Sequence, residues 1–265
     1  MIGYLVILAT VLLSLAAAPA AAGKNPRLWE LKQAVAANPQ DPQAHYNLGL
    51  KYESLGKTKQ AAAEYKQVLS LKPNDGKALY SLGRALGELG ETGQAIDILK
   101  QAVKLNPDAA EARSLLAAAY NRQGTRLMEQ GSLSAAREAL EAGIQVKGDP
   151  AETEALRNNL GCLYVRENRL DQAAETFQEV LRQNPNVPQA RYNLALLNYA
   201  QGDYQAASRQ LFALKGLDPG MAGELADYRF RIQTSTDWAP PVKTMLTFKG
   251  SPLLIKGSIP SDYEE

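Results

Sequence analysis

Along most of the chain, large apolar positions alternate with positions that carry glycine or alanine, and the pattern keeps the same period. Pro39, Pro73 and Pro107 are 34 residues apart, and Pro185 and Pro219 are separated by the same interval. A constant period of this length is the sequence signature of a repeat architecture. The chain is therefore expected to be a stack of similar helix pairs, each of which contacts only its neighbours.

Two positions of the repeat are small in every unit. The eighth position holds Gly49, Gly83, Gly124, Gly161 and Ala195, and the twentieth holds Ala61, Ala95, Ala136, Ala173 and Ala207. Large side chains stand at position 24, as Tyr65, Leu99, Leu140, Phe177 and Leu211, and at position 7, as Leu48, Leu82, Leu160 and Leu194. Small residues let two helices approach closely. Full burial of a large side chain stabilises by about 1.5–3 kcal/mol, too little for one helix pair, so the pairs must stack.

The pattern predicts five helix pairs, at residues 42–75, 76–109, 110–153, 154–187 and 188–221. The turn inside each pair carries a residue that favours the left-handed conformation of a helix C-terminus: Gly56, Gly90, Gly131, Asn168 and Gly202. Residues 25–39 predict a half-unit that caps the start of the stack, and residues 222–235 a helix that caps its end. Residues 236–265 leave the pattern at Pro240 and Pro241 and form either a flexible tail or a segment along the stack.

The third unit departs from the period, because Pro107 and Pro185 are 78 residues apart, ten more than two units need. About seven of these residues precede Ala117. Seven residues are about two helical turns, so they lengthen the first helix of this unit, expected at residues 110–130, by roughly 10 Å without rotating its apolar face. The insertion is either neutral or a ledge that a partner uses.

The sequence Tyr46-Asn-Leu-Gly49, together with Tyr52, Ala61, Tyr65 and Pro73, resembles the tetratricopeptide repeat family, and the resemblance covers about residues 26–234. It implies an all-α fold, a right-handed superhelical solenoid of about five helix-turn-helix units with a capping helix at each end. It also implies that the first helices line a concave groove, which binds a peptide or helix of a partner protein. The fold alone does not identify a process, since such repeats serve many pathways.

In this family, fixed positions of the first helix face the groove. The resemblance therefore implies a partner-binding groove made of Tyr46, Asn47, Tyr80, Arg84, Asn121, Arg122, Asn158, Asn159, Arg166, Tyr192, Asn193 and Tyr199. Asparagine amides can bond an extended backbone as donor and acceptor, and tyrosines offer contact area at little cost in rotamer entropy. The tyrosines also suit packing on the neighbouring helix, so both roles stay open for them. The lysine and asparagine set by which chaperone-binding members hold a C-terminal carboxylate is missing: Tyr46 and Leu50 replace it in the first unit.

The composition of the chain argues against most catalytic and metal-binding functions. The formal net charge is +1, which gives no field that would attract nucleic acid. One histidine, His45, and one cysteine, Cys162, exclude multi-histidine and cysteine-based metal sites, and no nucleophile motif accompanies them. Cys162 is expected to pack rather than to react. We predict that the protein is not an enzyme and that it has no cofactor, metal, nucleic-acid partner or small-molecule substrate. A catalytic triad would need His45 as its base, so an activity that is lost in His45→Ala would support an enzyme instead.

Residues 1–22 carry no charged side chain. They fit a membrane anchor, for which about 20 apolar residues suffice, and Lys24, Arg27 and Lys32 would then place the repeats in the cytoplasm. They also fit a cleaved signal peptide ending at Ala20 or Ala22, with a periplasmic or extracellular product. The sequence therefore predicts a protein-interaction scaffold or assembly factor at a membrane, or alternatively an exported periplasmic adaptor of a cell-envelope complex.

Overall fold

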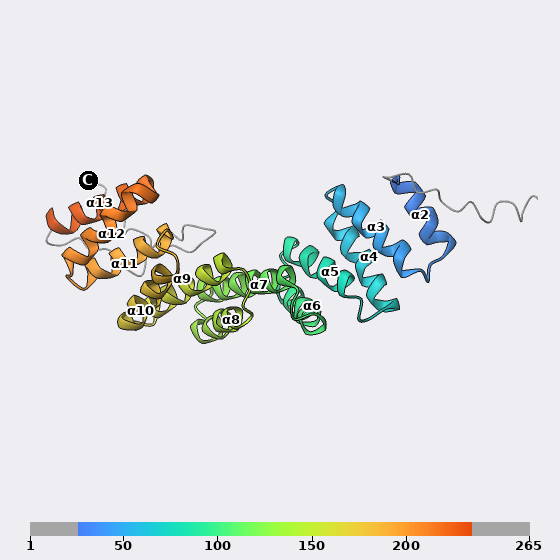
Figure 1. Cartoon of the computed structure of the whole chain (residues 1–265), viewed down its shortest axis with the longest axis horizontal. Helices are drawn as coiled ribbons and strands as arrows, with labels where there is room; N and C mark the ends of the chain where they lie inside the picture. The colour runs from blue at the N-terminus through green and yellow to red at the C-terminus, as the bar shows by residue number, and fades with distance from the viewer. Residues whose placement is uncertain (1–25, 235–265) are drawn as a thin grey trace, which may run out of the picture. The chain divides into compact units, whose positions relative to one another are not determined.

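The computed structural model describes residues 26–234, and within that range every regular element is an α-helix (Figure 1). The expected anchor or signal segment at residues 1–22 and the tail at residues 236–265 lie outside the described residues. None of the helices in residues 26–234 is both long enough and apolar enough to span a bilayer.

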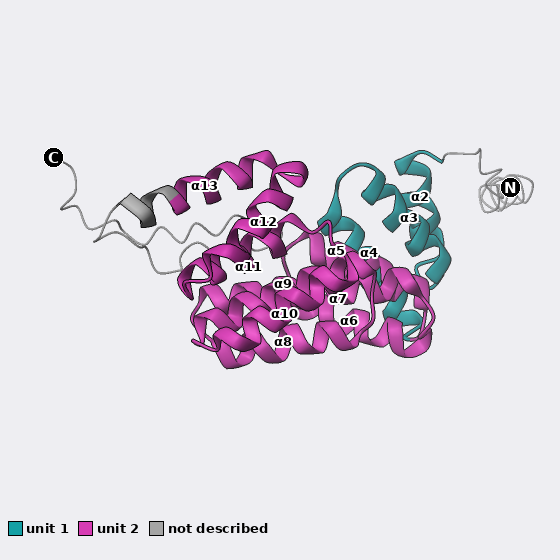
Figure 2. Cartoon of the chain, turned by 60° about the vertical axis from the view of Figure 1, so that its left-hand side comes forward, with its two compact units in different colours: residues 1–73 teal, residues 74–265 magenta. Residues whose placement is uncertain are grey.

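The chain packs as two compact units, residues 1–73 and 74–265, a division that the repeat pattern does not predict (Figure 2). The described part of the first unit holds three helices: α2 (Leu28–Ala37), α3 (Pro42–Ser54) and α4 (Thr58–Leu71). The described part of the second holds α5 (Gly76–Glu88), α6 (Thr92–Leu105), α7 (Ala110–Glu129), α8 (Leu133–Gln145), α9 (Pro150–Arg166), α10 (Leu170–Gln183), α11 (Pro188–Ala200), α12 (Tyr204–Leu217) and α13 (Pro219–Thr234).

Inside the first four helix pairs, the small residue of the first helix receives the large residue of the second. A Cβ atom added to Gly161 would lie 2.5 Å from a ring carbon of Phe177, and one added to Gly83 would lie 2.5 Å from Cγ of Leu99. The same relation joins Gly49 to Tyr65 and Gly124 to Leu140. These four large side chains are fully buried or 1% exposed. The predicted pairing of small and large positions is confirmed for these units, and even an alanine at the glycines would force a rearrangement.

The five turns between the paired helices have the predicted left-handed backbone. Glycine supplies it at four of them, and Asn168 supplies it in the fourth pair with φ 63°. Asparagine tolerates this conformation better than other residues with a side chain, because its short amide bonds locally. Lys147, with φ 54°, is a further left-handed residue in the turn between α8 and α9, which sequence analysis did not anticipate.

Two helices begin earlier than the repeat boundaries suggest, because aspartates cap them. Asp149 accepts a hydrogen bond from the backbone N–H of Ala151 at 2.8 Å, so α9 begins at Pro150 rather than near residue 154. Asp218 accepts one from Met221 at 3.0 Å, and α13 begins at Pro219 rather than near residue 222. A proline in the first turn suits both starts, since its missing N–H would have no helical partner there.

The inserted residues lengthen α7 to 20 residues, against 13 in α5. Its additional N-terminal turns pack against the turn that joins α8 to α9. The backbone N–H of Asp149 donates to Oγ of Ser114 at 2.9 Å, and Nε of Arg113 donates to the carbonyl of Lys147 at 3.2 Å. The left-handed Lys147 therefore belongs to a turn that is shaped to cover the insertion.

Candidate functional site

The predicted groove residues lie on the first helices of the pairs. Within the second compact unit these helices contact one another in series, from α5 through α7, α9 and α11 to α13. The groove residues of α5, α7, α9 and α11 are thus carried by one continuous set of packed helices. Tyr46 and Asn47 lie on α3, in the first compact unit.

In the first unit, Tyr46 is half-buried and its ring lies 5.6 Å from that of Tyr65. Asn47 is exposed, and its Oδ1 accepts a hydrogen bond from Nε2 of Gln43 at 2.9 Å. It also lines a cavity of about 280 Å³ between α2 and α3, with Leu31 and Leu50. Asn47 therefore lies at the surface, whereas Tyr46 takes part in the packing of its own helix pair.

The interface of α5 with α7 keeps its polar residues within reach of solvent. Arg84 and Arg122 line a cavity of about 280 Å³ together with Gly83 and Gly87. Nη1 of Arg122 donates to the carbonyl of Gly87 at 2.5 Å, near the C-terminus of α5, and Nη1 of Arg84 lies 3.7 Å from Glu88. The guanidinium group of Arg122 thus holds the end of α5, while that of Arg84 pairs with a carboxylate of its own helix.

The interface of α7 with α9 joins two of the predicted asparagines. Nδ2 of Asn159 donates to Oδ1 of Asn121 at 2.6 Å and lies 3.5 Å from Oγ1 of Thr125. Asn159 is fully buried, and within residues 26–234 its Oδ1 has no hydrogen-bond partner. Arg166 reaches from α9 to the carbonyl of Met128, 2.5 Å away, at the end of α7. Asn121 remains half-buried.

The interface of α9 with α11 joins the other two asparagines. Nδ2 of Asn193 donates to Oδ1 of Asn158 at 3.0 Å and lies 3.3 Å from Sγ of Cys162. Asn158, Asn159 and Asn193 are at most 1% exposed. Their burial disagrees with the expectation that these amides are open to a partner in the groove. Asn159 and Asn193 do not pair with each other; each joins its own helix to the preceding first helix.

The two tyrosines of α11 pack against neighbouring helices, which is one of the two roles that the sequence left open for them. Tyr192 and Tyr199 are 2% and 4% exposed. Burial, and secondarily the neighbouring carboxylate of Glu224, raises the pKa of Tyr192. The ring of Tyr199 lies 6.1 Å from that of Tyr228 on α13, and burial raises the pKa of both phenols. Tyr80 on α5, in contrast, is only half-buried.

The two residues that could have supplied nucleophilic chemistry are both interior. Burial raises the pKa of the Cys162 thiol far more than the nearby Arg166 lowers it, so the thiol stays protonated. His45 is buried, with Nδ1 2.7 Å from a carboxylate oxygen of Glu64 and Nε2 3.1 Å from the carbonyl of Pro39. Both ring nitrogens therefore hold α3 to its surroundings. In the described part of the chain, no three His, Cys, Asp or Glu residues are grouped as a metal site.

Sequence analysis missed the arginine contacts to helix ends. Arg122 and Arg166 were expected to face a partner, yet each also donates to a backbone carbonyl of the preceding first helix. A long side chain can serve both a groove and the neighbouring helix end, and a repeat pattern carries no signal that separates the two. Each arginine is separated from the residue whose carbonyl it contacts by 35 or 38 residues, which is about one repeat. This spacing is the only sign of these contacts in the sequence.

Comparison with known proteins identifies the repeats. Two models of the tetratricopeptide repeat match, at residues 52–119 and 158–222, which together are about half of the chain. The chain is 30% identical over 86 residues to the photosystem I assembly protein Ycf3 of Synechococcus sp. (strain CC9902), covering 32% of this chain and 50% of the relative. It is 28% identical over 90 residues to the protein of the same name from Cyanophora paradoxa, covering 34% and 52%. The chain thus spans about half the length of these curated relatives.

Solved structures agree with the fold. YrrB, described as a tetratricopeptide repeat protein with an unusual peptide-binding site, superposes with a TM-score of 0.51 at 19% identity, covering 76% of this chain and all of YrrB. A double mutant of MamA RS-1 superposes with a TM-score of 0.50 at 21% identity, covering 67% and 94%. The prediction of an all-α fold of stacked helical repeats is confirmed.

Proposed function

The chain belongs to the tetratricopeptide repeat family, and we propose that it is a protein-interaction scaffold without catalytic activity of its own. Its partner peptide or helix binds along the first helices of the repeats. Stacked repeats present a long surface made of many similar positions, which suits the recognition of an extended segment. The buried Cys162 and His45 leave no activated nucleophile or base among the residues considered for chemistry.

The observation that carries this proposal is the cavity between α5 and α7. Arg84 and Arg122 bring guanidinium groups to this cavity, and Gly87, which has no side chain, leaves the backbone of α5 close to it. Planar guanidinium groups bind carboxylates and carbonyl oxygens well. Tyr80, half-buried on the same α5, adds aromatic contact area. This part of the predicted groove suits an acidic or backbone oxygen of the partner.

We further propose that the scaffold takes part in assembling a larger protein complex. The support is the similarity to two proteins named as photosystem I assembly factors, although the matched segment is about half of each. Residues 1–22 would attach the scaffold to a membrane or direct its export. If the mature chain from its native cells begins at Gly23, the segment is a signal peptide; if it begins at the N-terminus and sediments with membranes, the segment is an anchor.

Photo-crosslinking from a single residue tests the binding surface. The full-length chain carries benzoylphenylalanine in place of Tyr80 and is irradiated in its native cells, and the adducts are identified by mass spectrometry. The matched control places the same group at Phe212 on α12, which is 81% exposed on a second helix. We expect a partner adduct from position 80 and none of the same protein from position 212. An adduct from position 212 alone would place recognition outside the first helices.

Affinity measurements with the captured partner then test the arginines. Replacing both Arg84 and Arg122 by alanine should weaken binding about ten-fold to a few hundred-fold, because charge-assisted hydrogen bonds are lost from a partly enclosed site. The matched control, Lys59→Ala with Lys66→Ala, removes two exposed positive charges from α4. Equal effects of both pairs would mean that net charge, rather than this cavity, governs binding.

A further inference from the structure

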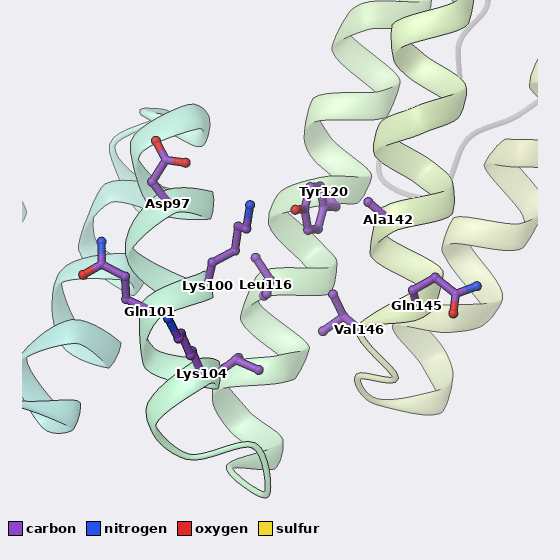
Figure 3. A pocket seen from close by; sticks show the side chains of 10 residues that line it. Asp97, Lys100, Gln101, Lys104, Leu116, Tyr120, Ala142, Gln145 and Val146 are labelled. Carbon is purple, nitrogen blue, oxygen red and sulfur yellow. The ribbon is translucent and has the colours of Figure 1, made fainter. Parts of the chain in front are cut away.

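A second concave feature lies on the other side of α7 from the predicted groove. The helices α6 and α8 flank a cleft of about 720 Å³, and α7 forms its floor (Figure 3). None of the predicted groove residues lines it. It is built mainly by the second helices of two neighbouring pairs, which the family resemblance does not assign to a partner.

The insertion in the third unit borders this cleft at Leu116. The helix α8 packs on the C-terminal half of α7, where Leu140 fills the space at Gly124, and a Cβ atom added to Gly143 would lie 3.0 Å from Cβ of Tyr120. The end of α8 thus lies against α7 beside Tyr120, and the turn that follows α8 covers the inserted residues around Ser114. Leu116 and Tyr120 of α7 line the space between α6 and α8, Tyr120 half-buried and Leu116 3% exposed (Figure 3).

The lining has two chemically different parts. The floor and the α8 side are mainly apolar, with Leu116, Tyr120, Ala142 and Val146. The α6 side carries Lys100 and Lys104, which are exposed, and Asp97 is the one acidic residue of the lining. Lysine stems lie readily along apolar surface while the ammonium groups stay in water, so this wall can border an apolar ligand and still present positive charge.

We propose that this cleft binds a segment of a partner protein in which large apolar side chains are followed by acidic residues. A volume of about 720 Å³ falls within the range of sites for small ligands, about 300–1,000 Å³, and admits a few side chains rather than a whole domain. The apolar side chains rest on Tyr120 and Val146, and the acidic residues face Lys100 and Lys104. Two lysines beside an aspartate make no track for phosphates, which disfavours nucleic acid.

The cleft and the predicted groove are separate sites, so the chain could hold two proteins, or two parts of one, at the same time. The inference does not depend on the groove, because Arg84 and Arg122 lie outside the cleft. A negative binding result at one site therefore does not count against the proposal for the other.

Fluorescence polarisation with designed peptides tests the proposal on the full-length chain. The probe is a fluorescein-labelled peptide with leucine and phenylalanine followed by consecutive glutamates. One comparison peptide carries lysines in place of the glutamates, and a second carries serines in place of the apolar residues. We expect the probe to bind at least about ten-fold more tightly than either, since both the apolar floor and the lysine wall contribute.

Two variants locate the binding. Charge reversal by Lys100→Glu with Lys104→Glu should weaken the probe about ten-fold and shift preference toward the lysine peptide, because two attractive pairs become repulsive. Its control is Lys59→Glu with Lys66→Glu on α4. Ala142→Trp should block the cleft and abolish binding, whereas Ala135→Trp, at an exposed position of the same helix, should change the affinity by less than about two-fold.

Three outcomes overturn the proposal. The first is equal binding of the probe and the serine peptide, and the second is binding that neither cleft variant changes. The third concerns the chain itself, whose residues 259–265 combine apolar and acidic side chains. If the probe binds only after Asp262→Asn, Glu264→Gln and Glu265→Gln, the occupant is this segment and not a partner. If Ala142→Trp alters the circular dichroism spectrum, the charge-reversal variant, which changes exposed residues only, decides the test.

Discussion

The interface of α9 with α11 and that of α5 with α7 occupy equivalent places in the repeat, yet they use their polar residues differently. Between α9 and α11, the amides of Asn158 and Asn193 are buried and bonded to each other. Between α5 and α7, Arg84 and Arg122 border an open cavity and Arg122 holds a helix end. Positions that a family pattern assigns to partner binding can therefore serve internal packing in one repeat and border an open cavity in another.

The difference has a physical cause in side-chain length. An asparagine amide is close to its own backbone, so it reaches only the neighbouring helix, and once buried it must find a partner there. Arginine can bond a carbonyl of the neighbouring helix with one N–H group and still present others to a ligand. The C-terminal repeats are thus expected to be held more firmly by their polar residues than the interface of α5 with α7.

The largest effects should come from the core that both regions share. Phe177→Ala in the fourth pair should destabilise by about 3–5 kcal/mol and Leu99→Ala in the second by about 2–5 kcal/mol, because each fills the space at a glycine of its partner helix. Urea unfolding followed by circular dichroism measures both. A loss below about 1 kcal/mol in either would mean that the small and large positions are paired incorrectly.

The next largest effects separate the two interfaces. Asn193→Ala should cost about 1–3 kcal/mol, since it leaves the buried Oδ1 of Asn158 without this donor. Asn159→Ala should cost less, because its own Oδ1 already has no partner within residues 26–234. Arg122→Ala should cost less than about 1 kcal/mol, since water can replace its exposed hydrogen bond. If urea unfolding showed that Asn193→Ala and Arg122→Ala lower the free energy of unfolding equally, the two interfaces would not differ in the way described.

Alkaline pH should weaken the C-terminal repeats in particular. Burial raises the folded-state pKa of Cys162, Tyr192, Tyr199 and Tyr228, so each group favours folding fully below its ordinary pKa. That contribution declines as pH rises above about 9 for cysteine and about 10 for tyrosine, where only the unfolded chain ionises readily. We expect the free energy of unfolding to fall over this range, and Cys162→Ala to reduce the early part of the fall. Stability that stays constant to pH 11 in urea titrations would contradict these burial effects.

The smallest effect serves as the reference for the others. Lys57 is exposed in the turn beside Gly56, so Lys57→Ala should change the free energy of unfolding by no more than about 0.5 kcal/mol. A larger change in the same urea titration would show that the turns contribute more than their exposure suggests. The comparison between the interfaces would then need correction for such surface effects.

Sequence analysis predicted the fold well and the accessible surface less well. Gly161 with Phe177 and the left-handed Asn168 follow from local rules of volume and backbone conformation, which a repeat pattern displays directly. The burial of Asn193 depends on how closely α11 approaches α9, which the spacing of residues along one helix does not contain. The turn at Lys147 likewise depends on contacts of the inserted residues with a segment far along the chain, and the cleft beside α7 depends on how α6 and α8 pack against α7.

The most direct test of the contrast between the two interfaces is a double-mutant cycle on Asn158 and Asn193. The free energies of unfolding in urea are measured for the original chain, Asn158→Ala, Asn193→Ala and the double variant. If the two amides stabilise the packing through each other, the double variant should lose less stability than the sum of the single losses, by about 0.5–3 kcal/mol. Additive losses, each below about 0.5 kcal/mol, would contradict the account and return these asparagines to a role in partner binding.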